Sequence, residues 1–217
     1  MRPILLILSL VFTGLGACSP RSLSETDFYR WLNDSDNGLV QTRKVNRVEV
    51  TVKYLPAGLL AYKEWKRLPG AGQGDLDSLR NLYGHSHAFL LTLKPDKEGS
   101  APQSQLPEDV LYRGVDSYQA YQQRIRQLNF GMADCVELRT DKGVFKPVLH
   151  TLENTYGVVG HRSIYLVFTE ESGQHGLFSG QPLDFTFKDD FFDTGIHHFL
   201  FDPNQFQQAP TILSAHD

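Results

Sequence analysis

The sequence has no excess of basic charge. Its 217 residues include 21 lysines and arginines against 25 aspartates and glutamates, which gives a formal net charge of −4 at pH 7. A protein that binds nucleic acid or an anionic lipid surface through charge needs a basic patch. We therefore expect no nucleic-acid partner, and no electrostatic attachment of the folded body to a membrane.

Complete catalytic motifs are also missing. The chain contains no Gly-x-Ser-x-Gly nucleophile elbow and no cysteine–histidine signature. A glycine-rich stretch at 69–74 lacks the lysine and the preceding strand of a phosphate-binding loop. No internal repeat is present. These absences favour a non-catalytic binding or assembly module over an enzyme, while a hydrolase that uses a metal or an aspartate stays open.

The first eighteen residues carry the strongest signal. Arg2 gives a short positive region, and residues 4–12 form an apolar run that is shorter than the roughly 20 residues a bilayer-spanning helix needs. The segment ends in Leu-Gly-Ala-Cys at 15–18, which resembles the lipobox of bacterial lipoproteins. That resemblance implies cleavage before Cys18 and acylation of Cys18, for example with palmitate. An ordinary secretory cleavage after Ala17 fits less well, because Leu15 is not a small residue.

The lipobox defines the expected domains and location. Removing the signal peptide at 1–17 leaves 200 residues, enough for one sizeable domain. We expect a polar tether at 18–25 and a single globular domain at 26–217. Several acyl chains on Cys18 would anchor the protein stably. Because Ser19 is not an aspartate, the lipoprotein resemblance implies outer-membrane residence. Arg21, with no acidic residue before Glu25, favours a domain that faces the periplasm over one exported to the cell surface, and we expect an envelope protein as partner.

Cysteine is otherwise scarce, with Cys135 as the second of two. If lipid occupies Cys18, no disulfide within the chain is possible. A lone cysteine in an oxidising compartment is either buried or paired with another molecule. We expect Cys135 to be buried as a small apolar residue.

Hydrophobic periodicity indicates many strands and a few helices. Valines and a tyrosine alternate with polar residues over 47–54, which predicts a strand with one buried face. Further strands are expected at 88–93, 135–140, 144–149, 162–169, 183–187 and 196–201. Helices are expected from Phe28, with Ser24 as its cap, and at 58–68, 75–83 and 117–128. The second half of this pattern is mostly strand, so we predict a mainly β fold with helices (α+β), an antiparallel β-sandwich-like single domain.

Some details of the pattern are specific enough to check. The helix at 75–83 should turn four side chains inward: Leu76, Leu79, Leu82 and Tyr83. The helix at 117–128 should do the same with Tyr118, Tyr121, Ile125 and Leu128. Residues 95–107 read as a polar loop, and the chain from Pro203 onward reads as a tail. Tyr54, Tyr62, Tyr118 and Tyr121 could alternatively line a sugar-binding surface.

Two stretches resemble uncharacterised lipoproteins of Bacteroidetes bacteria. They are Val-Lys-Tyr-Leu-Pro-Ala-Gly-Leu-Leu-Ala-Tyr-Lys-Glu at 52–64 and Phe-Phe-Asp-Thr-Gly-Ile-His-His-Phe-Leu-Phe at 191–201. The resemblance implies no activity.

The triplet Asp193-Thr194-Gly195 matches the sequence around the catalytic aspartate of aspartic proteases. In that family a second aspartate shares a proton with the first. This chain has one such triplet, with Ile196 after the glycine. The alternative is a turn between two strands, in which Asp193 accepts hydrogen bonds from the following backbone and Gly195 adopts a positive φ. We favour the turn.

Two groups of side chains could hold a metal. Acidic residues cluster near the end of the chain and could bind calcium: Asp184, Asp189, Asp190 and Asp193. His85 and His87 would lie on one face of an extended segment and could bind zinc if a third ligand joined them from elsewhere, with His150, His161 and the pair His197-His198 as candidates. The alternatives are a solvated acidic turn and a hydrogen-bonded strand entrance, so the expected cofactor is none beyond the lipid.

Overall fold

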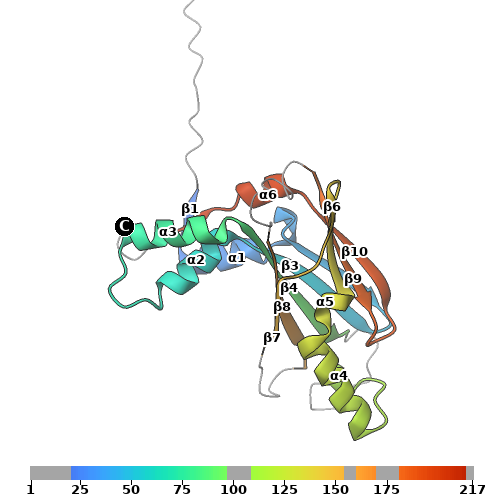
Figure 1. Ribbon diagram of the computed structural model, residues 1–217. Coiled ribbons are helices and arrows are strands. Elements are labelled where there is room, and N and C mark those ends of the chain that lie inside the picture. The colour runs from blue at the N-terminus through green and yellow to red at the C-terminus, as the bar shows by residue number, and fades with distance from the viewer. Residues whose placement is uncertain (1–20, 97–108, 154–159, 170–180, 214–217) are drawn as a thin grey trace, which may run out of the picture.

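The computed structural model describes residues 21–96, 109–153, 160–169 and 181–213. These residues form a single mixed α+β domain with two main antiparallel sheets (Figure 1). The buried apolar residues belong to one cluster, so this part of the chain has its own core. The predicted α+β class and the antiparallel pairing are confirmed.

The first main sheet has five strands in the order β2-β3-β4-β8-β7. Their bounds are β2 Val40–Val45, β3 Val48–Leu55, β4 Ser86–Pro95, β7 Leu149–Leu152 and β8 Arg162–Thr169. The second has four strands in the order β10-β9-β5-β6, with bounds β5 Val136–Thr140, β6 Gly143–Phe145, β9 Leu183–Asp189 and β10 Gly195–Phe201.

The helices flank these sheets. They are α1 Glu25–Leu32, α2 Ala57–Trp65, α3 Gln73–Tyr83, α4 Tyr118–Phe130, α5 Met132–Cys135 and α6 Pro203–Gln207. Short 3-10 turns occur at Ser35–Asn37 and Val110–Tyr112. Figure 1 shows α1, α2 and α3 together at one side of the sheets and α4 at the opposite end. No helix in the described ranges is long and apolar enough to cross a membrane.

The predicted strand at 47–54 is β3, whose period of two places Val48, Val50 and Val52 in the core with no exposed surface. The strand predicted at 88–93 is β4, which pairs with β3 on one side and β8 on the other. It therefore lies at the centre of its sheet. At the first helix, Ser24 Oγ accepts a hydrogen bond from Asp27 N, as the cap prediction requires.

The two main sheets share an aromatic core. Phe89 of β4 lies 5.1 Å from Phe185 of β9 and 5.3 Å from Phe201 of β10, measured between ring centroids. Phe168 of β8 is 5.9 Å from Phe89 in an edge-to-face arrangement. These separations are within the range of favourable aromatic pairs, and all four rings are fully buried. The inward faces of both sheets are therefore stabilised by the same contacts.

Two predicted inward residues are exposed instead. Leu82 of α3 is 66% exposed, because α3 packs through a narrow stripe that contains Leu76, Leu79 and Tyr83. Tyr118, the first residue of α4, is 73% exposed. Amphipathic spacing identifies which side of a helix is apolar. How much of that side is buried depends on the neighbouring element that packs against it.

Several predicted boundaries differ from the structure. The strand predicted at 144–149 is two short strands in different sheets, since β6 ends at Phe145 and β7 begins at Leu149. The periodicity analysis did not find β2. Pro95 belongs to β4, and the part of the expected polar loop from 97 to 107 lies outside the described residues.

The expected tether and tail are partly wrong, because they pair with each other. Residues Ser22–Leu23 form β1, which runs parallel to β11 at Thr211–Ile212. Phe206 of α6 stacks on Tyr54 of β3 with ring centroids 3.6 Å apart. Two-residue strands and one-turn helices have no readable periodicity, so only long-range pairing reveals them.

We predict that Phe206→Ala lowers the free energy of unfolding by about 2 kcal/mol, because it removes a half-buried ring from the stack on Tyr54. Phe130→Ala is the matched control, since Phe130 is 78% exposed and its loss should change stability by less than about 0.5 kcal/mol. Urea unfolding of both variants measures the difference. Equal losses would show that the segment from Pro203 is a tail after all.

Candidate functional site

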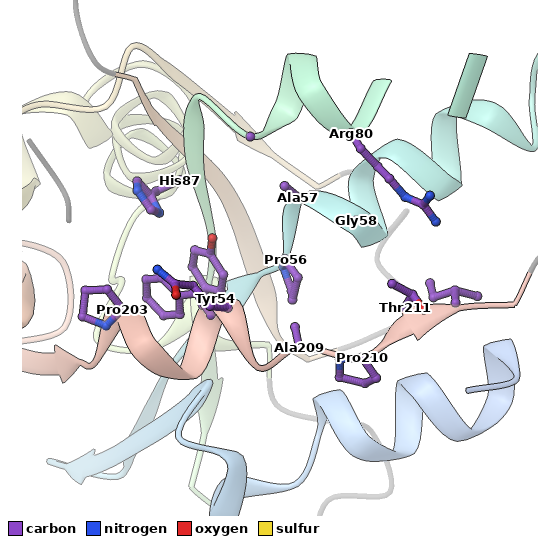
Figure 2. Close-up of a pocket in the computed structure, with 14 residues that line it drawn as sticks. Tyr54, Pro56, Ala57, Gly58, Arg80, His87, Pro203, Ala209, Pro210 and Thr211 are labelled. Carbon is purple, nitrogen blue, oxygen red and sulfur yellow. The ribbon is translucent and has the colours of Figure 1, made fainter. Parts of the chain in front are cut away.

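A cleft of about 500 Å³ lies where the start of α2 and the end of α3 meet the segment from α6 to β11. Figure 2 shows Pro56 and Ala57 on one wall facing Ala209 and Pro210 on the other. The two walls are about 150 residues apart in the sequence and meet through the pairing of β1 with β11 and the docking of α6. Volumes of this size are typical of small-molecule sites.

Proline fixes the local structure of both walls. Pro56 ends β3 and precedes the first residue of α2, with φ −57°. Pro203 is near the start of α6, where Asp202 Oδ1 caps the helix by accepting a hydrogen bond of 2.9 Å from Asn204 N. A proline is tolerated at a helix start because its missing N–H would have no helical acceptor there. The result is two rigid apolar rings at the cleft surface.

Aromatic rings form one end of the cleft. Tyr54 and Phe206 stack, and the His87 ring lies 5.9 Å from Tyr54 and 5.8 Å from Phe206 between centroids. Tyr54 is buried, and burial raises the pKa of its hydroxyl well above the ordinary value. The hydroxyl therefore stays protonated and neutral at every physiological pH.

The other end of the cleft carries a positive charge. Figure 2 shows Arg80 of α3 extending towards Thr211, away from His87. Arg80 Nη1 donates to Asp77 Oδ1 at 2.9 Å, a partly exposed pair within one helix. Among the described residues that line the cleft, Arg80 is the one lysine or arginine, and none is an aspartate, glutamate or cysteine. The lining thus has no carboxylate–nucleophile pair, and it is chemically suited to binding.

The two histidines predicted as zinc ligands have different environments. His87 lies in β4 and lines the cleft, whereas His85 precedes the strand and is exposed. In the parts of the chain that the structure describes, no group of three or more histidine, cysteine, aspartate or glutamate side chains could hold a metal ion. Neither the zinc hypothesis nor the calcium hypothesis acquires a ligand set there.

The turn between β9 and β10 is confirmed, but a different aspartate organises it. Asp189 Oδ1 accepts hydrogen bonds from Phe191 N at 2.8 Å and Phe192 N at 3.0 Å, and its Oδ2 accepts one from Thr194 N at 2.8 Å. Thr194 Oγ1 lies 2.8 Å from Nε2 of the buried His197. The bond from the backbone N–H two residues after Asp189 to its carboxylate is the ordinary pattern of a turn aspartate.

Asp193 itself is exposed, with φ 56°, and no described hydrogen bond uses its carboxylate. Our expectation that Asp193 caps the turn is therefore wrong, because the loop curls around Asp189, four residues earlier. The Asp193 carbonyl oxygen accepts a hydrogen bond from the Asn46 side chain. Gly195 has φ 83°, as expected of a glycine in this turn, and both phenylalanines before Asp193 are buried.

Sequence analysis missed Arg124, which fastens this turn to α4. Its guanidinium donates to the carbonyl oxygens of Leu111 at 3.0 Å and Phe191 at 2.8 Å, and it lies 4.8 Å from the ring centroid of Phe192. The carbonyl oxygen of Arg113 is a third acceptor for the guanidinium. Three carbonyl groups and one aromatic ring, from separate segments, therefore surround the Arg124 side chain. No sequence pattern marks an arginine for such a role, since its partners are backbone atoms.

Cys135 is buried, as predicted. Burial, with Asp190 nearby, raises the pKa of its thiol to about 11. The thiol is protonated at neutral pH, and a protonated thiol is a poor nucleophile. Cys135 therefore belongs to the core. Cys18 lies outside the described residues, so its acylation stays a prediction.

A second charged group lies on the outer face of the four-stranded sheet. Glu137 of β5 is 7% exposed, and its carboxylate accepts hydrogen bonds from Lys188 at 2.8 Å, Arg139 at 2.7 Å and Lys146 at 3.2 Å. The bonds to Lys188 and Arg139 lower the pKa of Glu137 to about 2, against an ordinary value of 4.5. One acid thus holds three basic side chains from three strand regions together.

Asp189→Asn should lower the free energy of unfolding by about 2 kcal/mol, because an amide replaces an acceptor of several hydrogen bonds. Asp193→Asn, the matched control in the same loop, should change it by less than about 0.5 kcal/mol, since Asp193 is exposed. Denaturant unfolding of both compares them directly. A larger loss at Asp193 would contradict the geometry of the turn.

The Glu137 cluster predicts a dependence of stability on pH. A carboxyl group whose folded pKa is lowered stabilises the fold above its unfolded pKa, and that contribution is lost as pH falls through the folded value. The difference in unfolding free energy between the native protein and Glu137→Gln should therefore be constant above pH 4.5 and disappear towards pH 2. Urea titrations at pH 7, 4 and 2.5 measure it. A difference that does not change with pH would exclude the cluster as its source.

Comparison with known proteins adds little to this description. No protein-family model matches the chain, and no curated protein matches it. A crystal structure of a protein of unknown function from Burkholderia pseudomallei is similar over 87% of this chain and 94% of its own, at 11% identity and a TM-score of 0.36. A likeness at that level carries no argument about function.

Proposed function

We propose that the chain is a lipid-anchored, non-catalytic binding or assembly module of the cell envelope. It would be held in the outer membrane through Cys18, face the periplasm, and work with an envelope protein partner. The observation that carries this proposal is the Leu-Gly-Ala-Cys sequence at 15–18, directly after a short apolar run.

The position of β1 supports a location close to the bilayer. Ser22 pairs with Thr211, so the folded body begins only four residues after Cys18. Four extended residues reach at most about 14 Å. An anchor at Cys18 would therefore hold the end of the domain that contains β1 and β11 near the membrane. Thr211 also lines the cleft, which places the cleft at that same end.

The contents of the cleft support binding over catalysis. Its described lining pairs apolar walls with Arg80 and His87 and contains no aspartate, glutamate or cysteine side chain. The hydroxyl of Thr211, which also lines the cleft, lies 2.9 Å from Ser22 Oγ in the pairing of β1 with β11. The competing proposal is an envelope hydrolase that uses zinc at His85 and His87 or an aspartate at Asp193. It lacks support because, among the described residues, no third ligand joins His85 and His87, and because Asp193 is an exposed turn residue.

We also infer that the two main sheets make a sandwich-like pair. The contacts of Phe89 with Phe185 and Phe201 support it, since they join the inward faces of both sheets. Such a rigid scaffold would present the cleft in a fixed orientation to the membrane.

Acylation at Cys18 is the decisive test. The intact mass of protein purified from bacterial envelopes should correspond to residues 18–217 plus acyl chains. Cys18→Ala should release the protein from the membrane fraction or block its maturation. Retention of an unmodified Cys18→Ala protein in the outer membrane would contradict the anchor.

Protease treatment of intact cells locates the domain. A periplasmic domain should resist external protease until the outer membrane is permeabilised, while digestion in intact cells would place it on the cell surface. Cys135→Ala is the control, since Cys135 is buried and its loss should leave both acylation and location unchanged.

A further inference from the structure

We propose that the cleft binds a single-chain anionic amphiphile, such as a fatty acid, with the aliphatic chain along the proline-lined walls and the acid group beside Arg80. This deepens the proposed function and rests on it only for the source of the ligand at the membrane. The cleft and its chemistry belong to the described residues alone.

The walls favour an apolar chain. Between Tyr54 at one end and Arg80 at the other, the surface is supplied by proline rings and alanine methyl groups (Figure 2). Pro56 and Ala57 oppose Ala209 and Pro210 along this length. Gln207 and Thr211 also line the cleft, but apolar groups supply most of the wall, so a wholly polar ligand would lose more hydration here than it regains in hydrogen bonds.

An aliphatic chain fits these walls better than a flat ring does. Phe206 covers a face of Tyr54 at a centroid distance of 3.6 Å, so that face is not available for a ligand ring to stack on. Methyl groups and proline rings form an uneven apolar surface, and a flexible methylene chain can adapt its shape to such a surface. The volume of about 500 Å³ is within the range of small-molecule pockets.

The charge at the rim selects an acid. Arg80 provides up to five N–H donors, of which Asp77 engages Nη1. No described lining residue has a carboxylate, and Asp77, the ion-pair partner of Arg80, is not part of the lining. A carboxylate or phosphate beside the guanidinium makes a charge-assisted hydrogen bond, stronger than a bond between neutral groups. A ligand with one acidic end and one apolar chain uses both features.

Gly58 allows a sharp test. It lines the cleft from α2, and a Cβ built there meets no other atom within 4 Å. Gly58→Leu therefore starts from an open Cβ position at the cleft and should occupy part of the cleft volume, and a leucine is also a better helix former than glycine. Gly74→Leu is the matched control, because Gly74 is an exposed helical glycine with the same open surroundings and is not part of the lining.

The experiment measures the fluorescence of cis-parinaric acid, a fatty acid, during titration of water-soluble protein. This protein starts at residue 18 and carries Cys18→Ser, so it cannot be acylated there. It retains every described element, and circular dichroism with thermal melting verifies its fold. We expect saturable binding at one site, weakened at least tenfold by Gly58→Leu and less than twofold by Gly74→Leu. Ala209→Leu narrows the opposite wall and should also weaken binding, which keeps the test decisive if Gly58→Leu does not fold.

The charge is tested by displacement of the probe with laurate and with dodecanol, which share a twelve-carbon chain. Arg80→Gln should weaken laurate about tenfold, as expected for loss of one charge-assisted bond. It should leave dodecanol within twofold.

Three outcomes would overturn the proposal: no saturable binding, equal binding by folded Gly58→Leu, or equal effects of Arg80→Gln on acid and alcohol. Because the protein in this experiment is unacylated, failure here leaves the Cys18 anchor standing. Failure of acylation likewise leaves the binding result intact.

Discussion

A continuous series of aromatic contacts connects the core of this protein to its cleft. Phe185 of the four-stranded sheet packs on Phe89 of the five-stranded sheet, and Tyr54 lies 5.4 Å from Phe89. Tyr54 then carries the stacked ring of Phe206. The segment from α6 to β11, which forms one cleft wall, is thereby attached to the core that holds the two main sheets together.

The same attachment determines where the strands β1 and β11 lie. Once Phe206 docks on Tyr54, β11 is placed beside β1, and the two short strands pair through Ser22 and Thr211. Two-stranded pairing is marginal in isolation, so it depends on the packing around it. The strands β1 and β11 consequently lie together at one end of the domain, and the cleft, which Thr211 of β11 lines, lies there too.

Half-buried polar side chains stabilise the structure at the opposite end of the domain. Asp189 ties the turn between β9 and β10 to its own backbone, and Arg124 ties that turn to α4. Buried polar groups are costly unless they are hydrogen-bonded, so each of these side chains satisfies several partners. This explains why an Asp-Thr-Gly sequence occurs here without the second aspartate of a protease.

The sequence by itself determined what local chemistry decides. The period of two in β3, the Ser24 cap and the positive φ of Gly195 each follow from a few neighbouring residues. The Leu-Gly-Ala-Cys sequence at 15–18 is a local signal of the same kind, and its identification as a lipobox stays a prediction.

The tertiary structure alone decided the cleft, the pairing of β1 with β11 and the roles of Asp189 and Arg124. The cleft, the strand pair and the contacts of Arg124 bring together backbone or apolar atoms distant in the sequence, and neither backbone carbonyls nor proline rings leave a pattern that identifies their partners. Long-range packing also chose between equivalent local candidates, as when the turn formed around Asp189 and left Asp193 in solvent.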